Sequence, residues 1–152
     1  MPKPRTLEEV YDRCVSEGQI AELSESNVEM AKGLTLNADI SVDSAKALSK
    51  LFSKSDKGWL AVFTSHHDAL QMYARALLIL HKVSSHDPQC LFASLCLKNP
   101  DFDWDFFERI RTLREGIDHN GKQIGHPEWK ELELGFALTI SLLKKEIEKS
   151  VK

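Results

Sequence analysis

The sequence has few cysteines, which can cross-link a chain, and few prolines and glycines, which interrupt helices and strands. Among 152 residues it has 3 cysteines, 5 prolines and 7 glycines. An odd number of cysteines without a C-x-x-C pair argues against both a disulfide framework and a zinc knuckle. We therefore expect Cys14, Cys90 and Cys96 to be three small, buried, unpaired residues.

Long apolar runs and a strong net charge are also missing. No stretch approaches the roughly 18 uncharged apolar residues of a membrane span, and the first residues are followed by charged ones rather than by an apolar segment. We expect a cytoplasmic protein with no membrane contact. The net charge of −3 gives no global field that attracts nucleic acid, so an RNA-binding patch has to be local.

Most catalytic signatures are absent as well. The chain has no phosphate-cradling glycine loop, no G-x-S-x-G and no H-E-x-x-H. Of its 6 histidines, only His67 and His81 share a helical face, and they are four turns apart, so we predict no metal site and no cofactor. We interpret His67, on the apolar side of its helix, as a hydrogen-bonded core histidine.

What the sequence does contain is helical periodicity. It predicts an all-α, antiparallel bundle of about five main helices, formed by a single domain over residues 1–152. A short peripheral helix is expected over 6–18, where Thr6 and Glu9 have the spacing of a capping box. The core bundle is expected over about 24–149, and no strand pair or repeat is found.

Apolar spacing and helix stop signals divide the core bundle. A helix is expected over 24–54, where Gly33 and β-branched residues favour a kink, and a central helix over 59–82 is apolar over a broad arc. The next helix should begin at Pro88 and end before Pro100.

Two more helices complete the pattern. The fifth starts near Asp103 and closes at His119-Asn120-Gly121, and the last carries lysines at its C-terminal end, as the helix dipole prefers. The predicted apolar seam of the fifth helix comprises Phe106, Ile110, Leu113 and Ile117. The seam of the last helix runs from Trp129 to Ile147.

The fifth helix carries the sharpest chemical feature. Arg111 and Arg114, three residues apart, share one flank and form a small basic site at the edge of the core. His119 lies about 140° from Arg114 around an ideal helix, so the two cannot meet on one face of an unbroken helix. Fraying at Gly116 or at the Asn120-Gly121 turn, or a second chain, would bring them together.

This part of the sequence resembles the HEPN domains of bacteria and archaea. These domains carry an arginine followed after four to six residues by a histidine, as in Arg114-x4-His119, and an alanine-rich central helix, as in Ala69–Leu78. The resemblance covers about Ser24 to Lys149. It implies a metal-independent endoribonuclease, usually a homodimer with two arginine–histidine pairs across a cleft, and in some members the toxin of a toxin–antitoxin pair.

The resemblance also implies roles for individual residues. His119 would accept the proton of an RNA 2′-hydroxyl, and Arg114 would stabilise charge on the scissile phosphate, leaving a cyclic phosphate. Arg111, Asp118 and Asn120 are the candidate substrate-binding residues.

One departure from the family supports an alternative function. Active members commonly have asparagine, aspartate or histidine directly after the arginine, whereas Glu115 stands here and would repel phosphate. Asp118 adds a second negative charge, although it could also orient the imidazole. The alternative is a non-catalytic dimerisation or nucleotide- or protein-binding module that partners a nucleotidyltransferase-type protein. A purely structural interpretation of the two residues is also open, in which a solvent-facing Arg114 pairs with Glu115 or Asp118 while His119 caps its helix.

Overall fold

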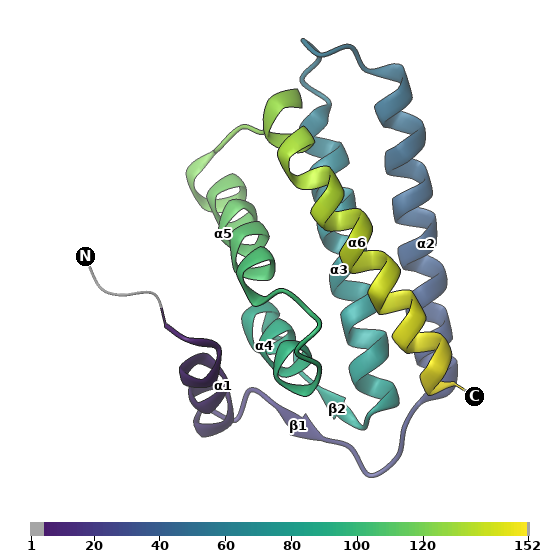
Figure 1. Cartoon of the computed structure of the whole chain (residues 1–152), viewed down its shortest axis with the longest axis vertical. Helices are drawn as coiled ribbons and strands as arrows, with labels where there is room; N and C mark the ends of the chain where they lie inside the picture. Colours follow the sequence, from purple (N-terminus) through teal and green to yellow (C-terminus); the bar gives the residue numbers. More distant parts are fainter. Residues whose placement is uncertain (1–4, 152) are drawn as a thin grey trace.

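The chain folds into a helical bundle with one very small sheet. The computed structural model describes residues 5–151, and Figure 1 shows its elements in order. They are α1 (Leu7–Ser16), β1 (Ala21–Glu22), α2 (Val28–Leu51), α3 (Trp59–Leu80), β2 (Val83–Ser84), α4 (Pro88–Lys98), α5 (Trp104–Asn120) and α6 (His126–Ser150). The predicted all-α bundle is thereby confirmed, and no helix within the described residues has the length and apolarity needed to cross a membrane.

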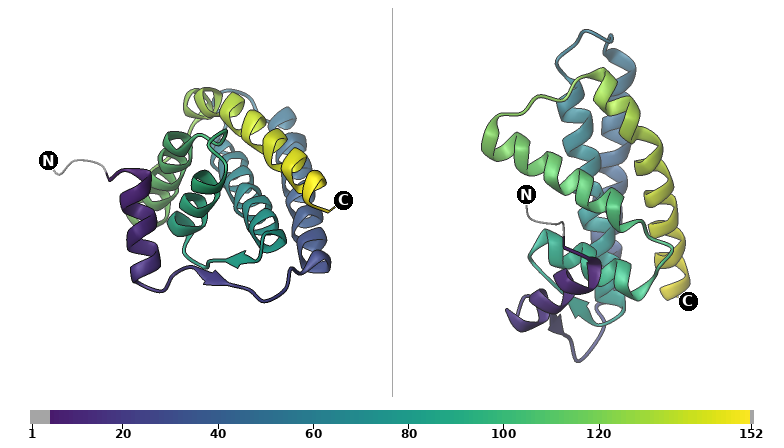
Figure 2. Two further views of the ribbon diagram at one scale, coloured as in Figure 1. Left: turned by 60° about the horizontal axis from the view of Figure 1, so that its bottom comes forward. Right: turned by 60° about the vertical axis from the view of Figure 1, so that its left-hand side comes forward.

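The helix α3 lies at the centre because it is apolar around most of its circumference. It packs against α2 and α6 on one side and against α4 and α5 on the other (Figures 1 and 2). Phe63 of α3 contacts the ring of Phe136 on α6 edge to face, with ring centroids 5.9 Å apart. On the other side, Phe92 of α4 stacks on Phe107 of α5 with centroids 4.6 Å apart. The core is therefore continuous from α2 and α6 on one side of α3 to α4 and α5 on the other.

Side-chain caps set where most helices begin. Thr6, Asn27, Asp87 and Asp103 each accept a hydrogen bond from the backbone N–H three residues later, which satisfies one of the free donors of a first turn. The end of α5 is set by Gly121, whose φ of 65° lies in the left-handed region that favours glycine. The expected end of this helix is confirmed.

Two expectations about the second helix are wrong. The second helix begins at Val28, after its cap Asn27, and not near residue 24, and it continues through Gly33 without a break. An interior glycine costs only about 1 kcal/mol relative to alanine, and packing along α3 outweighs that cost. In α5, the predicted seam faces the core, with Ile110 fully buried and Phe106, Leu113 and Ile117 partly buried against it, and Phe107 is a further fully buried residue.

The expectation that no strands pair is also wrong. Ala21 pairs with Ser84 and Glu22 with Val83, in an antiparallel ladder. This ladder attaches the segment between α1 and α2 to the turn that follows α3 (Figure 2). Strands of two residues are too short to give a periodic pattern in the sequence.

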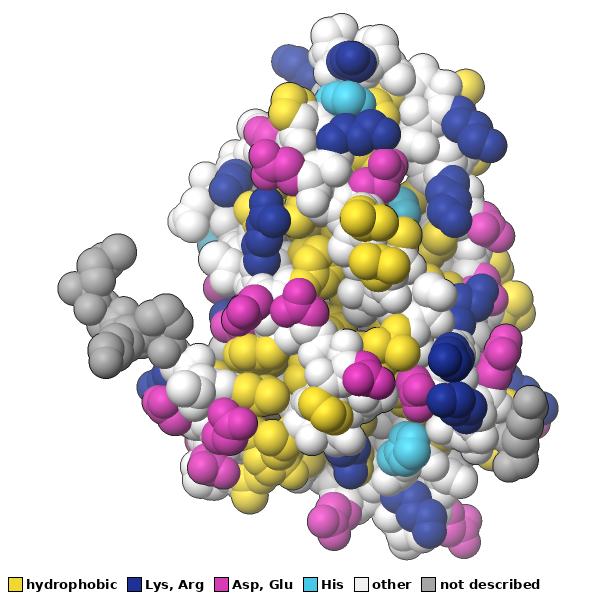
Figure 3. Space-filling view, viewed as in Figure 1, with side chains coloured by type: hydrophobic (Ala, Val, Ile, Leu, Met, Phe, Trp, Pro, Cys, Tyr) yellow, Lys and Arg dark blue, Asp and Glu magenta, His cyan; other side chains and the backbone are white. Residues whose placement is uncertain are grey.

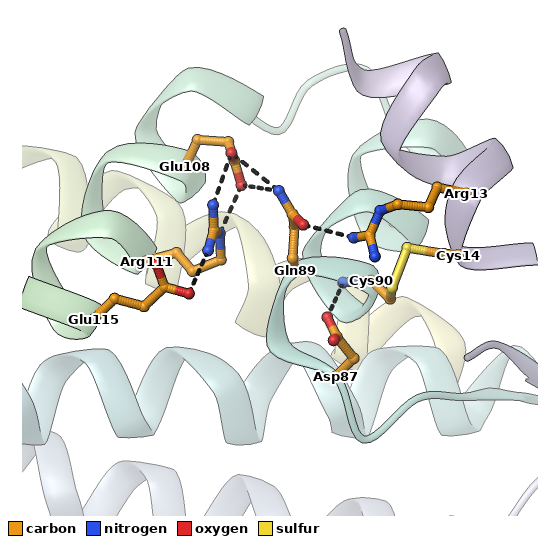
Figure 4. A network of polar contacts seen from close by, with 8 residues as sticks. All are labelled: Arg13, Cys14, Asp87, Gln89, Cys90, Glu108, Arg111 and Glu115. Carbon is orange, nitrogen blue, oxygen red and sulfur yellow. Dashed lines mark hydrogen bonds and ion pairs between the residues drawn. A yellow bond between two sulfur atoms is a disulfide. The ribbon is translucent and has the colours of Figure 1, made fainter. Parts of the chain in front are cut away.

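The cysteines provide a further correction. Cys14 of α1 and Cys90 of α4 form a disulfide, with their Cα atoms 5.7 Å apart across 76 residues of sequence (Figure 4), and only Cys96 is free and buried, as expected for all three. The pairing follows from the packing of α1 on α4, which no rule of cysteine spacing reveals. Burial raises the pKa of the Cys96 thiol to about 12, so this cysteine is an inert core residue.

Candidate functional site

The predicted residues of α5 border a pocket of about 680 Å³ between α1, α3, α4 and α5. Arg111, Arg114, Asp118 and His119 all line it. Asn120, the last residue of α5, is exposed and is not among the lining residues. The pocket is within the size range of small-molecule sites, roughly 300–1,000 Å³.

The structure does not show the fraying that was expected near Gly116. The helix continues through Asn120, so His119 stays about 140° from Arg114 around the helix axis. His119 is exposed, whereas the Arg114 side chain is 27% exposed. Both nevertheless line the same pocket.

Arg114 is held in place by carboxylates on two helices. Its Nε donates to Oδ2 of Asp118 over 3.1 Å, and its Nη1 lies 3.6 Å from Oδ1 of Asp68 on α3. The pairing with Asp118 is one of the two that the purely structural interpretation of Arg114 predicts. Nη1 is buried and donates no hydrogen bond within the described part of the chain, so the ion pair with Asp68 is its polar contact there.

Arg111 is more fully engaged. It donates through Nε and Nη2 to the two carboxylate oxygens of Glu108, over 2.9 and 3.1 Å, and through Nη1 to Glu115 over 2.9 Å. Hydrogen bonding to Glu108 raises the pKa of Arg111. A substrate phosphate would have to displace one of these carboxylates, so Arg111 mainly fixes this flank of α5.

The same carboxylate connects α5 to α1 (Figure 4). The side-chain amide of Gln89, on α4, donates to Glu108 over 3.2 and 3.3 Å and accepts from Arg13 of α1 over 2.7 Å. Arg13 immediately precedes Cys14. The disulfide and this hydrogen-bonded chain therefore join α1 to the pocket wall at neighbouring positions.

The sequence interpretation missed the contribution of α3. His67, Asp68 and Gln71 line the pocket opposite α5. His67 is buried as expected, with 1% of its surface exposed, but neither ring nitrogen has a hydrogen-bond partner among the described residues. Its Nδ1 lies 3.6 Å from Oδ1 of Asp68. The interpretation of His67 as a hydrogen-bonded core histidine is therefore wrong on the hydrogen bonds.

Charges in the pocket are balanced. Four arginines, Arg5, Arg13, Arg111 and Arg114, face four carboxylates, Asp68, Asp87, Glu115 and Asp118. Such a lining produces no strong field of one sign, so binding here depends on directed hydrogen bonds rather than on bulk attraction. Within residues 5–151, no group of three or more histidine, cysteine, aspartate or glutamate side chains is arranged to hold a metal ion.

A second hollow of about 700 Å³ lies between α2, α3 and α6 and is bordered by His66. The Nδ1 of His66 lies 2.7 Å from the carbonyl oxygen of Val62. Because a carbonyl only accepts, Nδ1 carries the proton in this contact. Burial lowers the pKa of His66, so the ring is a neutral imidazole packed against Trp129.

No protein-family model matches this chain, and neither does any curated protein or solved structure. The resemblance to HEPN domains therefore remains a prediction based on Arg114, His119 and the helix that carries them.

Proposed function

We propose that this protein is a HEPN-like domain that binds RNA in the pocket beside α5 and cleaves it without a metal ion. One observation carries the proposal: Arg114 and His119, the two residues that the chemistry needs, line the same pocket. The HEPN resemblance adds a partner to the proposal, the antitoxin of a toxin–antitoxin pair.

The chemistry requires one base and one donor. His119 accepts the proton of a ribose 2′-hydroxyl, and the 2′-oxygen attacks the adjacent phosphorus. The bond from phosphorus to the 5′-oxygen breaks, and that oxygen takes a proton from water. Arg114 donates from its guanidinium to a non-bridging oxygen as negative charge develops. The products carry a 2′,3′-cyclic phosphate and a 5′-hydroxyl.

The acidic residues of α5, which would repel a phosphate group, are paired with arginines. Glu115 is paired with Arg111 at 2.9 Å, and Asp118 is paired with Arg114 at 3.1 Å. Each negative charge thus has a cationic partner one turn away, which reduces its repulsion of a phosphate group. This arrangement supports RNA binding at α5 despite the departure at Glu115.

A specific surface observation supports a homodimer, which both the proposed function and the alternative of a dimerisation module include. Leu134 and Leu138, one turn apart on α6, are 67% and 63% exposed, and Figure 3 shows apolar side chains in the middle of the face that carries α6. A second copy of the chain is the proposed occupant, since the resemblance implies a homodimer. Light scattering of the wild type and of Leu138→Glu tests this, with a dimer expected only for the wild type.

The test of catalysis uses end-labelled RNA, both single-stranded and hairpin, incubated with the purified chain in EDTA. We expect the wild type to give fragments ending in a cyclic phosphate, and His119→Ala to be slower by about 100-fold or more. His86→Ala is the matched control, because His86 is exposed and lies outside this pocket. No cleavage, or equal cleavage by wild type and His119→Ala, would contradict the proposal.

A further inference from the structure

Polar atoms without partners gather on the sides of α3 and α5 that face each other. Within residues 5–151, 5 buried side-chain nitrogen or oxygen atoms lack a hydrogen-bond partner, and they include both ring nitrogens of His67 and Nη1 of Arg114. Both residues line the pocket beside α5. Buried polar groups are nearly always hydrogen-bonded in folded proteins, so these atoms mark the wall between α3 and α5 as the part of the pocket where polar partners are missing.

Two side chains beside His67 supply the hydrogen-bonding groups of this wall. Asp68 and Gln71, three residues apart on α3, lie on neighbouring positions of the helix surface, and both line the pocket. Oδ1 of Asp68 is 3.6 Å from both Arg114 and His67, while nothing in residues 5–151 pairs with its Oδ2. The Gln71 amide makes no hydrogen bond within the same residues. The wall therefore offers a carboxylate acceptor beside an amide donor.

We propose that this pocket holds a single unstacked guanine base, with Asp68 accepting from its N1–H and N2–H groups and Gln71 donating to its O6. The inference rests on the proposed function, because the base belongs to the nucleotide whose 2′-hydroxyl meets His119. Arg114 then lies between the base and the phosphate that follows it.

The charge balance of the pocket favours a base over a phosphate as its occupant. With four arginines and four carboxylates around it, the pocket suits a neutral group that has both donors and acceptors. Single-stranded RNA presents such groups when its bases are unstacked and bound by their Watson–Crick edges. The volume of about 680 Å³ leaves room for the base together with its ribose.

The carboxylate selects guanine among the four bases. Guanine alone presents two adjacent N–H donors on its Watson–Crick edge, which match the two oxygens of one carboxylate. Uracil has a single ring N–H there, and adenine and cytosine each place a ring nitrogen lone pair beside their amino group. A carboxylate would repel that lone pair, so Asp68 discriminates against both.

His67 acts as a positioning residue rather than as a contact to the base. Its ring is buried between Phe63 and Phe92, and its Nδ1 faces Oδ1 of Asp68. An N–H at Nδ1 that draws Oδ1 closer would fix the plane of the carboxylate for its two hydrogen bonds. We expect His67→Leu to reduce the preference for guanine while leaving the affinity for an adenine nucleotide unchanged.

The experiment measures binding of guanosine, inosine and adenosine 3′-monophosphates to the full chain by calorimetry. These nucleotides have no downstream residue to be cleaved, so binding is measured apart from catalysis. We expect the guanosine nucleotide to bind about tenfold or more tightly than the adenosine nucleotide. Inosine, which lacks the N2 amino group, should fall between them. Asp68→Asn should abolish this order, and Gln71→Ala should weaken guanosine binding.

The matched control is Asp105→Asn, because Asp105 is an exposed carboxylate of α5 outside this pocket. Asp68 has a side chain 55% exposed, so its substitution leaves the core untouched. Equal binding of the three nucleotides, or a guanine preference that survives Asp68→Asn, overturns the inference. RNA cleavage without a preference for guanine also overturns it and leaves the proposed function standing. Guanine-selective binding without any RNA cleavage supports the inference and contradicts the proposed function.

Discussion

Arg114 donates through Nε to Asp118, one turn further along α5, over 3.1 Å. The carboxylate holds the guanidinium at the edge of the pocket and also competes with a phosphate for it. Removing the charge of Asp118 while keeping an acceptor oxygen should therefore favour RNA. The pair is partly exposed, at 27% and 48%, so solvent limits the size of the effect.

We predict that Asp118→Asn binds a labelled single-stranded RNA about fivefold more tightly than the wild type, the effect of losing one exposed competing charge. Fluorescence anisotropy at low salt measures the dissociation constant, and Asp105→Asn is the control. Weaker binding by Asp118→Asn would show instead that the carboxylate contacts the substrate, as the sequence interpretation suggested.

The disulfide predicts a dependence of stability on redox conditions. Reducing the bond between Cys14 and Cys90 removes a constraint on the unfolded chain across 76 residues. We expect the free energy of unfolding in urea to fall by about 2–4 kcal/mol when dithiothreitol is added. A Cys14→Ser/Cys90→Ser variant should already be less stable by this amount and should not respond to the reductant. A wild type whose unfolding is unaffected by dithiothreitol would contradict the disulfide.

A close approach between α5 and α6 makes Gly135 intolerant of a side chain. A Cβ at this position would lie 2.4 Å from Cε1 of Phe106. We expect Gly135→Ala to destabilise the fold by about 1–3 kcal/mol, as overpacking usually does. Phe106→Leu in the same chain should recover part of this loss, because the clashing ring atom is gone.

The control for that prediction is Gly33, where an added Cβ meets nothing within 4 Å. Gly33→Ala should stabilise α2 by about 0.5–1 kcal/mol, because alanine is the better helix residue. Urea unfolding of the three variants gives the comparison. Equal effects of the two glycine substitutions would count against the close packing of Phe106.

Burial of His66 predicts how stability changes with pH. Burial lowers the pKa of His66 below its usual 6.5 in the folded chain, so the unfolded chain binds more protons below that pH. The free energy of unfolding should therefore decrease as the pH falls below 6.5, with a slope from this residue of at most about 1.4 kcal/mol per pH unit. Urea unfolding between pH 5 and 7.5 measures it.

His66→Gln should flatten this pH dependence, since glutamine can still donate to Val62 but does not titrate. The control His86→Gln, at an exposed position, should keep the slope of the wild type. If the slopes of wild type and His66→Gln are the same, the titration belongs to other groups.

The elements best predicted from the sequence are those with local signals. Asp87 followed by Pro88 starts α4 where predicted, and Gly121 ends α5 where predicted, because caps and turns act within a few residues. The seam of α5 was predicted without Phe107, since Phe106 and Phe107 are adjacent aromatics and tertiary packing decides how deeply each is buried. The pairing of Cys14 with Cys90 depends on contacts 76 residues apart and leaves no local pattern.

In the candidate site, too, the residues on one helix were predicted from the sequence and those on a second helix were not. Spacing along one helix identified Arg111, Arg114, Asp118 and His119, all of which line one pocket. It did not identify His67, Asp68 and Gln71, because their position opposite Arg114 depends on how α3 and α5 pack together. The apolar seam through His67 was visible in the sequence, but the absence of a partner for its ring nitrogens appears only in three dimensions.

The helix α1 is attached to the bundle separately from the main core. The buried apolar residues that α1 contributes, Val10 and Cys14, cluster with Cys90 and Ala93 and not with the buried residues around α3. Without the disulfide, α1 would be tethered to the bundle only by the segment that follows it. It would then exchange between a docked state on α4 and an undocked state, and the undocked population would be measurable. The covalent bond keeps it docked, so chemical reduction could release the N-terminal helix while the remaining five helices retain their shared core.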